Sequence, residues 1–126
     1  MKLAYVDTSY LVAIAFGEPG AGDLAARMKG FDGLFSSNLL EAEFRSALLR
    51  EQVCDPGRHF LSWLTWIFPD RPLTREIDRI AAVGYLRGAD LWHLANALFL
   101  APRGRELTFL TADRRQAEIA KKLDFA

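Results

Sequence analysis

Cysteine and long hydrophobic runs are nearly absent from this 126-residue sequence. The single Cys54 excludes an internal disulfide framework and any zinc site that needs several thiolates, so we expect a reducing, cytoplasmic compartment. No uncharged stretch approaches the roughly 18 to 20 apolar residues of a membrane-spanning helix, and no membrane partner is expected. These absences predict a soluble protein of the cytoplasm.

Net charge is also lacking, since sixteen Lys and Arg balance sixteen Asp and Glu. The chain therefore has no overall positive field with which to hold a nucleic acid, and such a partner must be bound by a local patch. Twelve of the sixteen basic residues are arginines, whose forked guanidinium groups suit phosphate. The arginines that flank the acids discussed below, and that could bind phosphate, are Arg45, Arg50, Arg87, Arg114 and Arg115.

Apolar residues make up 51% of the chain, enough to bury a core in one domain spanning residues 1–126. Short apolar segments alternate with segments of helical periodicity. The expected strands are Leu3–Val6, Leu34–Ser36, Ile67–Phe68 and Leu107–Leu110. The expected helices are Tyr10–Phe16, Ala21–Lys29, Asn38–Gln52, His59–Trp66, Thr74–Leu86, Leu91–Leu100 and Arg114–Lys122. This alternation predicts an α/β fold whose mainly parallel sheet has helices on both faces.

Two aspartates come directly after expected strands, Asp7 after the first and Asp113 after the last. Each has hydroxyl neighbours, namely Thr8 and Ser9 beside Asp7 and Thr111 beside Asp113. Ligand sites in open parallel sheets form outside the carboxyl ends of the strands, so both aspartates are candidate site residues. Each could instead merely cap the helix that follows it, and the sequence leaves both interpretations open.

Two further acids, Glu43 and Asp90, lie near expected helix starts. Asp90 could cap the helix that follows it. Glu41 stands three residues after Asn38, the spacing of a capping box, which favours a structural role for Glu41. Glu43 lies off the apolar stripe of its helix and could face the carboxyl edge of the sheet. A solvated helix glutamate is the alternative interpretation of Glu43.

Four carboxylates brought together would repel one another and raise their own pKa values unless a cation neutralised them. A hard divalent ion such as Mg²⁺ or Mn²⁺ suits carboxylate and water oxygens. Such an ion can activate water and stabilise the charge that develops on a phosphoryl group. If the four acids converge, a phosphodiester is therefore the expected substrate.

The four acids also lie in segments that carry a family resemblance. These segments are Tyr5–Ser9 (YVDTS), Ser37–Arg45 (SNLLEAEFR), Leu86–Ala95 (LRGADLWHLA) and Leu110–Arg115 (LTADRR). They follow one another in the family's order over nearly the whole chain. The sequence in this respect resembles PIN domain nucleases, and specifically the VapC-type toxins of bacterial and archaeal toxin–antitoxin pairs.

The resemblance implies a three-layer α/β/α PIN-like domain that cleaves single-stranded RNA with the help of Mg²⁺ or Mn²⁺. The residues that it implies as metal ligands and catalytic groups are Asp7, Glu43, Asp90 and Asp113, with Ser9 and Thr111 as supporting groups. It also implies a homodimer and a small antitoxin protein that occludes the active groove. Asn96 departs from the pattern, because relatives often carry a small hydroxyl residue there.

Several other residues have structural interpretations that we prefer. His93, three residues after Asp90, is expected to support a neighbouring group rather than bind metal, because no other His or Cys stands at ligand spacing. Trp63 and Trp66 could stack bases, but a core or dimer stripe is the favoured interpretation. The alternative function for the whole chain is a non-catalytic module that binds RNA or a protein, whose binding would be indifferent to chelators.

Overall fold

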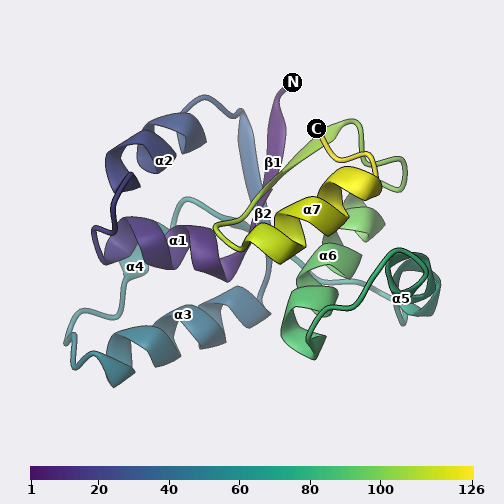
Figure 1. Ribbon diagram of the computed structural model, residues 1–126. Helices are drawn as coiled ribbons and strands as arrows, with labels where there is room; N and C mark the ends of the chain where they lie inside the picture. The colour runs from purple at the N-terminus through teal and green to yellow at the C-terminus, as the bar shows by residue number, and fades with distance from the viewer.

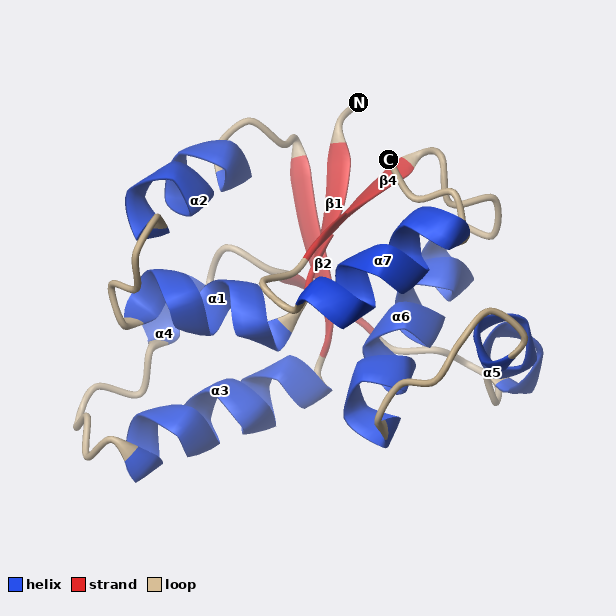
Figure 2. Cartoon of the chain, in the orientation of Figure 1, coloured by secondary structure: helices blue, strands red, loops and turns tan.

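A central sheet lies between two layers of helices in the computed structural model, which describes residues 1–126 (Figure 1, Figure 2). The strands are β1 (Leu3–Val6), β2 (Gly33–Ser37), β3 (Thr65–Ile67) and β4 (Leu107–Leu110). The helices are α1 (Thr8–Ala15), α2 (Ala21–Met28), α3 (Leu39–Arg50), α4 (Arg58–Leu61), α5 (Thr74–Ala81), α6 (Gly88–Leu100) and α7 (Arg114–Lys122). This arrangement confirms the predicted three-layer α/β/α fold.

All four strands are parallel and stand in the order β3-β2-β1-β4. The central strand β1 pairs with β2 on one side and with β4 on the other. The strands that follow β1 in the sequence are therefore added first on one side of it and then on the other. Strands β1 and β4 stay in register to their ends, where Val6 lies opposite Leu110. The residues that follow these two strands therefore emerge side by side at the carboxyl edge, where sites in such sheets form.

The alternation of side chains along β1 divides the core into two halves. Tyr5 belongs to the cluster that contains residues of α5, α6 and α7, whereas Ala4 and Val6 belong to the cluster that contains residues of α1 to α4. Tyr5 stacks on Phe109 of β4, with ring centroids 5.3 Å apart and ring planes 5° apart. Strand β1 is thus buried on both faces, as a strand in a helix-covered parallel sheet must be.

The expected helix from His59 to Trp66 is wrong in its second half. Helix α4 ends at Leu61, and residues 65–67 form strand β3, which pairs with β2 through Phe35 opposite Thr65. A β-branched threonine followed by tryptophan and isoleucine is a good strand sequence, and pairing with β2 outweighs the helical spacing of the aromatic residues. Phe68, expected in this strand, lies beyond it and is 70% exposed.

Two other helix boundaries differ from expectation. Helix α5 ends at Ala81 rather than near Leu86, because the backbone N–H groups of Val83 and Gly84 both turn back to the carbonyl of Ile80 at 2.9 and 3.1 Å. Helix α6 begins earlier than expected, at Gly88, so Asp90 lies in its first turn and does not cap it.

The capping box expected at the start of α3 does not form. Asn38 itself has helical dihedral angles, and its side-chain Nδ2 donates to Glu41 Oε1 at 3.1 Å instead of either side chain capping a backbone N–H. Glu41 also lies 3.9 Å from Arg45, so its contacts remain within its own helix. No helix of the chain is long and apolar enough to cross a bilayer.

Candidate active site

Asp7 lies at the carboxyl end of β1 and is only 2% exposed. Its carboxylate caps α1, since Oδ2 accepts a hydrogen bond from the backbone N–H of Ser9 at 3.1 Å. The hydroxyl of Ser9 donates to the same oxygen at 2.5 Å, and the Gln116 amide donates to Oδ1 at 3.2 Å. The sequence offered two interpretations of Asp7, as a helix cap or as a residue of a site at the sheet edge. The side chain of Asp7 caps α1 and also lies at the sheet edge.

Thr111, which follows β4, connects the second post-strand aspartate to the first. Its hydroxyl oxygen lies 3.2 Å from Asp7 Oδ2 and 2.8 Å from Gln116 Oε1, and it accepts a hydrogen bond from the backbone N–H of Asp113 at 3.0 Å. Asp113 caps α7, because its Oδ1 accepts from the backbone N–H of Gln116 at 3.0 Å. Gln116 is fully buried and also donates to the carbonyl of Asp90 at 3.2 Å, so one amide ties α7 to both β1 and α6.

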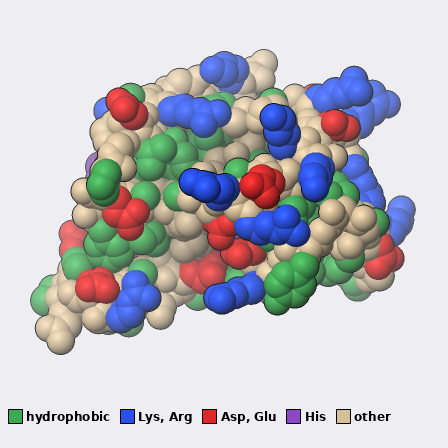
Figure 3. Space-filling view, viewed as in Figure 1, with side chains coloured by type: hydrophobic (Ala, Val, Ile, Leu, Met, Phe, Trp, Pro, Cys, Tyr) green, Lys and Arg blue, Asp and Glu red, His purple; other side chains and the backbone are tan.

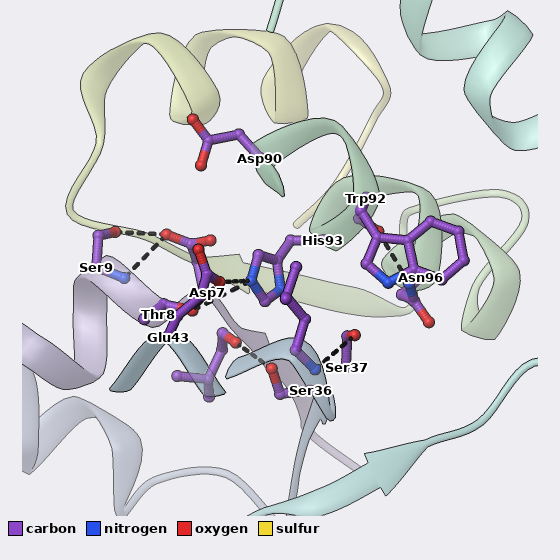
Figure 4. A network of polar contacts seen from close by, with 12 residues as sticks. Asp7, Thr8, Ser9, Ser36, Ser37, Glu43, Asp90, Trp92, His93 and Asn96 are labelled. Carbon is purple, nitrogen blue, oxygen red and sulfur yellow. Dashed lines mark hydrogen bonds and ion pairs between the residues drawn. The ribbon is translucent and has the colours of Figure 1, made fainter. Parts of the chain in front are cut away.

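Glu43 projects from α3 toward the start of α1 and toward α6, away from the apolar stripe of its own helix. Its Oε1 accepts hydrogen bonds from the Thr8 hydroxyl at 2.8 Å and from His93 Nε2 at 2.7 Å (Figure 4). The hydrogen bond from His93 is the main reason why the pKa of Glu43 is lowered, although partial burial opposes it. The alternative of a solvated helix glutamate is wrong, because Glu43 has two polar partners from other elements.

The tautomer of His93 follows from its second partner, Tyr5. The Tyr5 hydroxyl is fully buried, and burial raises its pKa far above the usual range, so it keeps its proton. This oxygen accepts from the backbone N–H of Ser37 at 3.0 Å and lies 2.7 Å from His93 Nδ1, to which it must donate. Nδ1 is therefore the acceptor, and Nε2 carries the proton that points at Glu43. A chain of hydrogen bonds runs from the centre of the sheet to a carboxylate at its edge.

Asp90 differs from the other three acids because no donor of the chain bonds its carboxylate. Figure 4 shows it apart from Asp7 and Glu43, with no dashed contact to either. Partial burial raises the pKa of Asp90, and the negative charges of Asp7 and Asp113 raise it further. The charges of neighbouring acids thus act on Asp90, whereas the pKa of Glu43 is lowered by its hydrogen bond with His93.

No Lys or Arg side chain lies within ion-pair distance of any of the four acids. The ion pairs of the chain join Arg45 to Glu41, Arg50 to Glu51, Arg71 to Glu76 and Arg115 to Glu118, and the contact of His93 with Glu43 is a hydrogen bond from a neutral imidazole. Figure 3 shows acidic side chains gathered near the centre of one face and bordered by basic ones. No three of the acidic side chains lie close enough together to coordinate one ion directly. Mg²⁺ nevertheless keeps several waters and is usually bound through one or two carboxylates, so this donor set suits a hydrated hard cation.

Sequence reasoning singled out His93 as a supporting residue without identifying its partners, which are Tyr5 and Glu43. It missed Gln116. Gln116 stands three residues after Asp113, a capping-box spacing that would have sent its side chain back to the Asp113 backbone instead of to Asp7. Only the packing of α7 on the sheet edge reveals the contact of Gln116 with Asp7.

The remaining candidates lie away from the acids. Asn96 is fully buried and donates to the carbonyl of Trp92 at 2.9 Å, while its Oδ1 has no partner. Figure 4 shows this pair on the far side of His93 from Asp7. Trp63 lines an apolar hollow of about 480 Å³ together with His59 of α4 and residues of α2, of β2 and of the segment between them, and none of the four acids contributes to it.

Comparison with known proteins agrees with this geometry. The family model of the PIN domain matches residues 4–122. Ribonuclease VapC45 of Mycobacterium tuberculosis (strain CDC 1551 / Oshkosh) is 32% identical over 130 residues, which cover 91% of this chain and 87% of the relative. Ribonuclease VapC49 of Mycobacterium tuberculosis (strain ATCC 25618 / H37Rv) matches with the same identity and coverage. The chain therefore belongs to the PIN domain family, as a VapC-type member.

Proposed function

We propose that residues 1–126 form one PIN domain that cleaves RNA phosphodiester bonds with the help of Mg²⁺ or Mn²⁺. The observation that carries this proposal is the group of Asp7, Glu43, Asp90 and Asp113 at one sheet edge, with no Lys or Arg paired to any of them. The raised pKa of Asp90 supports it, because the charges of neighbouring acids contribute to that shift. The two curated relatives are named as ribonucleases, which favours RNA as the substrate.

The four acids would hold the cation in different ways. Asp7 is fixed by Ser9 and Gln116, and Glu43 by Thr8 and His93, so both present their oxygens in defined positions. Asp90 makes no hydrogen bond through its carboxylate and is free to turn toward a ligand. Asp113 uses Oδ1 to cap α7, which leaves Oδ2 for a metal or its water.

When bound, a divalent cation would supply a water of lowered pKa and neutralise the charge on the phosphoryl oxygens. The chain's own contribution is to preorganise acceptors around that place before the substrate arrives. No side chain at this edge is arranged as a nucleophile, because the Ser9 hydroxyl donates to Asp7 and the Thr111 hydroxyl lies within the same bonded group. A hydrolytic step in which water attacks phosphorus is therefore the mechanism that we favour.

We further propose that this nuclease is the toxin of a toxin–antitoxin pair. Its partners would be an RNA substrate, a second copy of the chain in a homodimer, and a cognate antitoxin protein that covers the acidic edge. Release of the antitoxin would then expose the four acids to RNA.

The test is cleavage of labelled RNA by the purified protein in Mg²⁺, in Mn²⁺ and in EDTA. Asp90→Asn should lower the cleavage rate at least about 100-fold, because even groups that only support metal ligands are commonly worth 10- to 100-fold. Asp78→Asn is a matched control, since Asp78 is an exposed aspartate on α5 that makes no ion pair. Cleavage that persists in EDTA or in Asp90→Asn would contradict the proposal, and metal-indifferent RNA binding without cleavage would favour the non-catalytic module.

A further inference from the structure

Tyr85 lies in the loop between α5 and α6, and its backbone is fixed on both sides. A Cβ at the preceding Gly84 would lie 3.0 Å from Arg115 Nη2 and 3.1 Å from Ile119 Cδ1, so the loop lies tight against α7 there. The following Leu86 is buried, and the Tyr85 carbonyl accepts a hydrogen bond from Arg115 Nε at 3.4 Å. The loop therefore holds Tyr85 in a defined place.

Tyr85 is nevertheless 77% exposed. It lines a hollow of about 410 Å³ together with Leu86, Arg87, Asp90, Asp113 and Arg115. The same hollow thus contains two of the proposed metal ligands. An exposed aromatic ring contributes little to folding, so its position on an anchored backbone beside these acids calls for a ligand with an aromatic face.

The charges of the hollow specify that ligand further. Arg87 forms no ion pair, and the nearest carboxylate to the Arg115 guanidinium is that of Glu118 at 3.8 Å, where both side chains are half exposed. Exposed pairs of this kind are weak, so both guanidinium groups are available to a phosphate. A ring for a base and two guanidinium groups for phosphate together suit a nucleotide.

We propose that this hollow binds the unpaired nucleotide next to the scissile phosphate, with its base stacked on Tyr85 and its phosphate held by Arg87 and Arg115. This proposal rests on the proposed nuclease function and specifies which nucleotide of the RNA substrate the hollow binds. Stacking on a side chain requires a free base face, which bases inside a duplex do not offer. The hollow therefore favours single-stranded RNA and tolerates different bases.

The test measures binding rather than cleavage, in EDTA and in an Asp90→Asn background that keeps the RNA intact. The probes are a fluorescein-labelled 12-nucleotide oligoadenylate and a 12-unit ribose-phosphate strand without bases, followed by fluorescence anisotropy. Tyr85→Ala should weaken oligoadenylate binding roughly 5- to 150-fold and leave the abasic strand unaffected, whereas Tyr85→Phe should bind both like the parent. Because no cleavage is read, failure of the nuclease proposal and failure of this subsite are distinguishable.

Two controls complete the design. Phe68→Ala removes a similarly exposed aromatic residue beyond the opposite edge strand β3, outside the hollow that contains Asp90 and Asp113, and should change neither affinity. Arg87→Ala should weaken both strands alike and reduce the slope of log affinity against log salt by about 0.7. The proposal is overturned if Tyr85→Ala weakens the binding of both strands equally, or if it weakens neither. It is also overturned if Phe68→Ala weakens oligoadenylate binding as much as Tyr85→Ala does. A loss in Tyr85→Phe as large as in Tyr85→Ala would do the same.

Discussion

Replacement of Tyr5 by phenylalanine removes one oxygen atom from the chain of hydrogen bonds that ends at Glu43. The ring can stay in place, because its stacking on Phe109 does not involve the hydroxyl. The change leaves two buried groups without their partner, the backbone N–H of Ser37 and Nδ1 of His93. Each buried unsatisfied group costs roughly 1–3 kcal/mol, so we expect Tyr5→Phe to lower the free energy of unfolding by about 2–6 kcal/mol.

The same change should also affect the carboxylate at the far end of the chain. Without the phenol as donor, only the Glu43 carboxylate holds the His93 proton on Nε2, and the imidazole ring that orients Glu43 loses its other fixed contact. Groups that orient metal ligands in this way are typically worth about 10- to 100-fold in metal affinity or activity. We therefore expect Tyr5→Phe to weaken Mn²⁺ binding by about that factor, and ¹⁵N NMR of the metal-free protein to show a shifted Nδ1 resonance of His93, because this nitrogen loses its hydrogen-bond donor.

Tyr10→Phe is the matched control for this experiment. Tyr10 is also buried, but its hydroxyl makes a single hydrogen bond, to the carbonyl of Leu24 at 2.9 Å, on the other side of the sheet. We expect it to cost about 1 kcal/mol in urea unfolding and to leave Mn²⁺ affinity unchanged. The reasoning is refuted if Tyr5→Phe binds Mn²⁺ like the parent and unfolds no more easily than Tyr10→Phe.

Three further predictions concern stability. Because the pKa of Asp90 is raised, its ionised form opposes folding, and Asp90→Asn should raise the thermal midpoint of the metal-free protein at pH 7 by on the order of 2 °C; a lower midpoint would contradict this. The hydrogen bond with Arg71 lowers the pKa of Glu76 below 4.5, so this pair stabilises the fold above that pH and its contribution disappears on acidification. Glu76→Gln should therefore lower the thermal midpoint at pH 7 by roughly 1–3 °C and make the midpoint fall less when the pH is lowered. Gly57 has a φ of +73° and a Cβ there would lie 2.4 Å from Phe44 Cε2, so Gly57→Ala should cost more than about 2 kcal/mol in urea unfolding, and a cost below about 0.5 kcal/mol would argue against it.

The sheet and its helices were predictable because local patterns and global packing agree along most of the chain. Leu3–Val6 and Leu107–Leu110 are apolar runs that end at polar residues, and both are strands with the expected bounds. The segment around Trp63 was not predictable in the same way, because its aromatic spacing fits a helix while its last residues gain more from pairing with β2. Short edge strands depend on a neighbour that the local sequence does not reveal.

The candidate site shows the same division between local and long-range information. The positions of Asp7 and Asp113 follow from strand ends and could be read from the sequence. The partners of Glu43 could not, since Thr8 and His93 lie 35 and 50 residues away along the chain.

Helix capping by the two post-strand aspartates has an evolutionary consequence. Asp7 and Asp113 each start a helix through the same carboxylate that we assign to the metal, so a substitution that abolishes catalysis also removes a cap worth about 1 kcal/mol. Asparagine and serine retain the cap without the charge, whereas alanine and hydrophobic residues do not. Naturally inactivated descendants that still fold are therefore expected to carry Asn or Ser at these two positions, which gives genome surveys a signature for silenced copies.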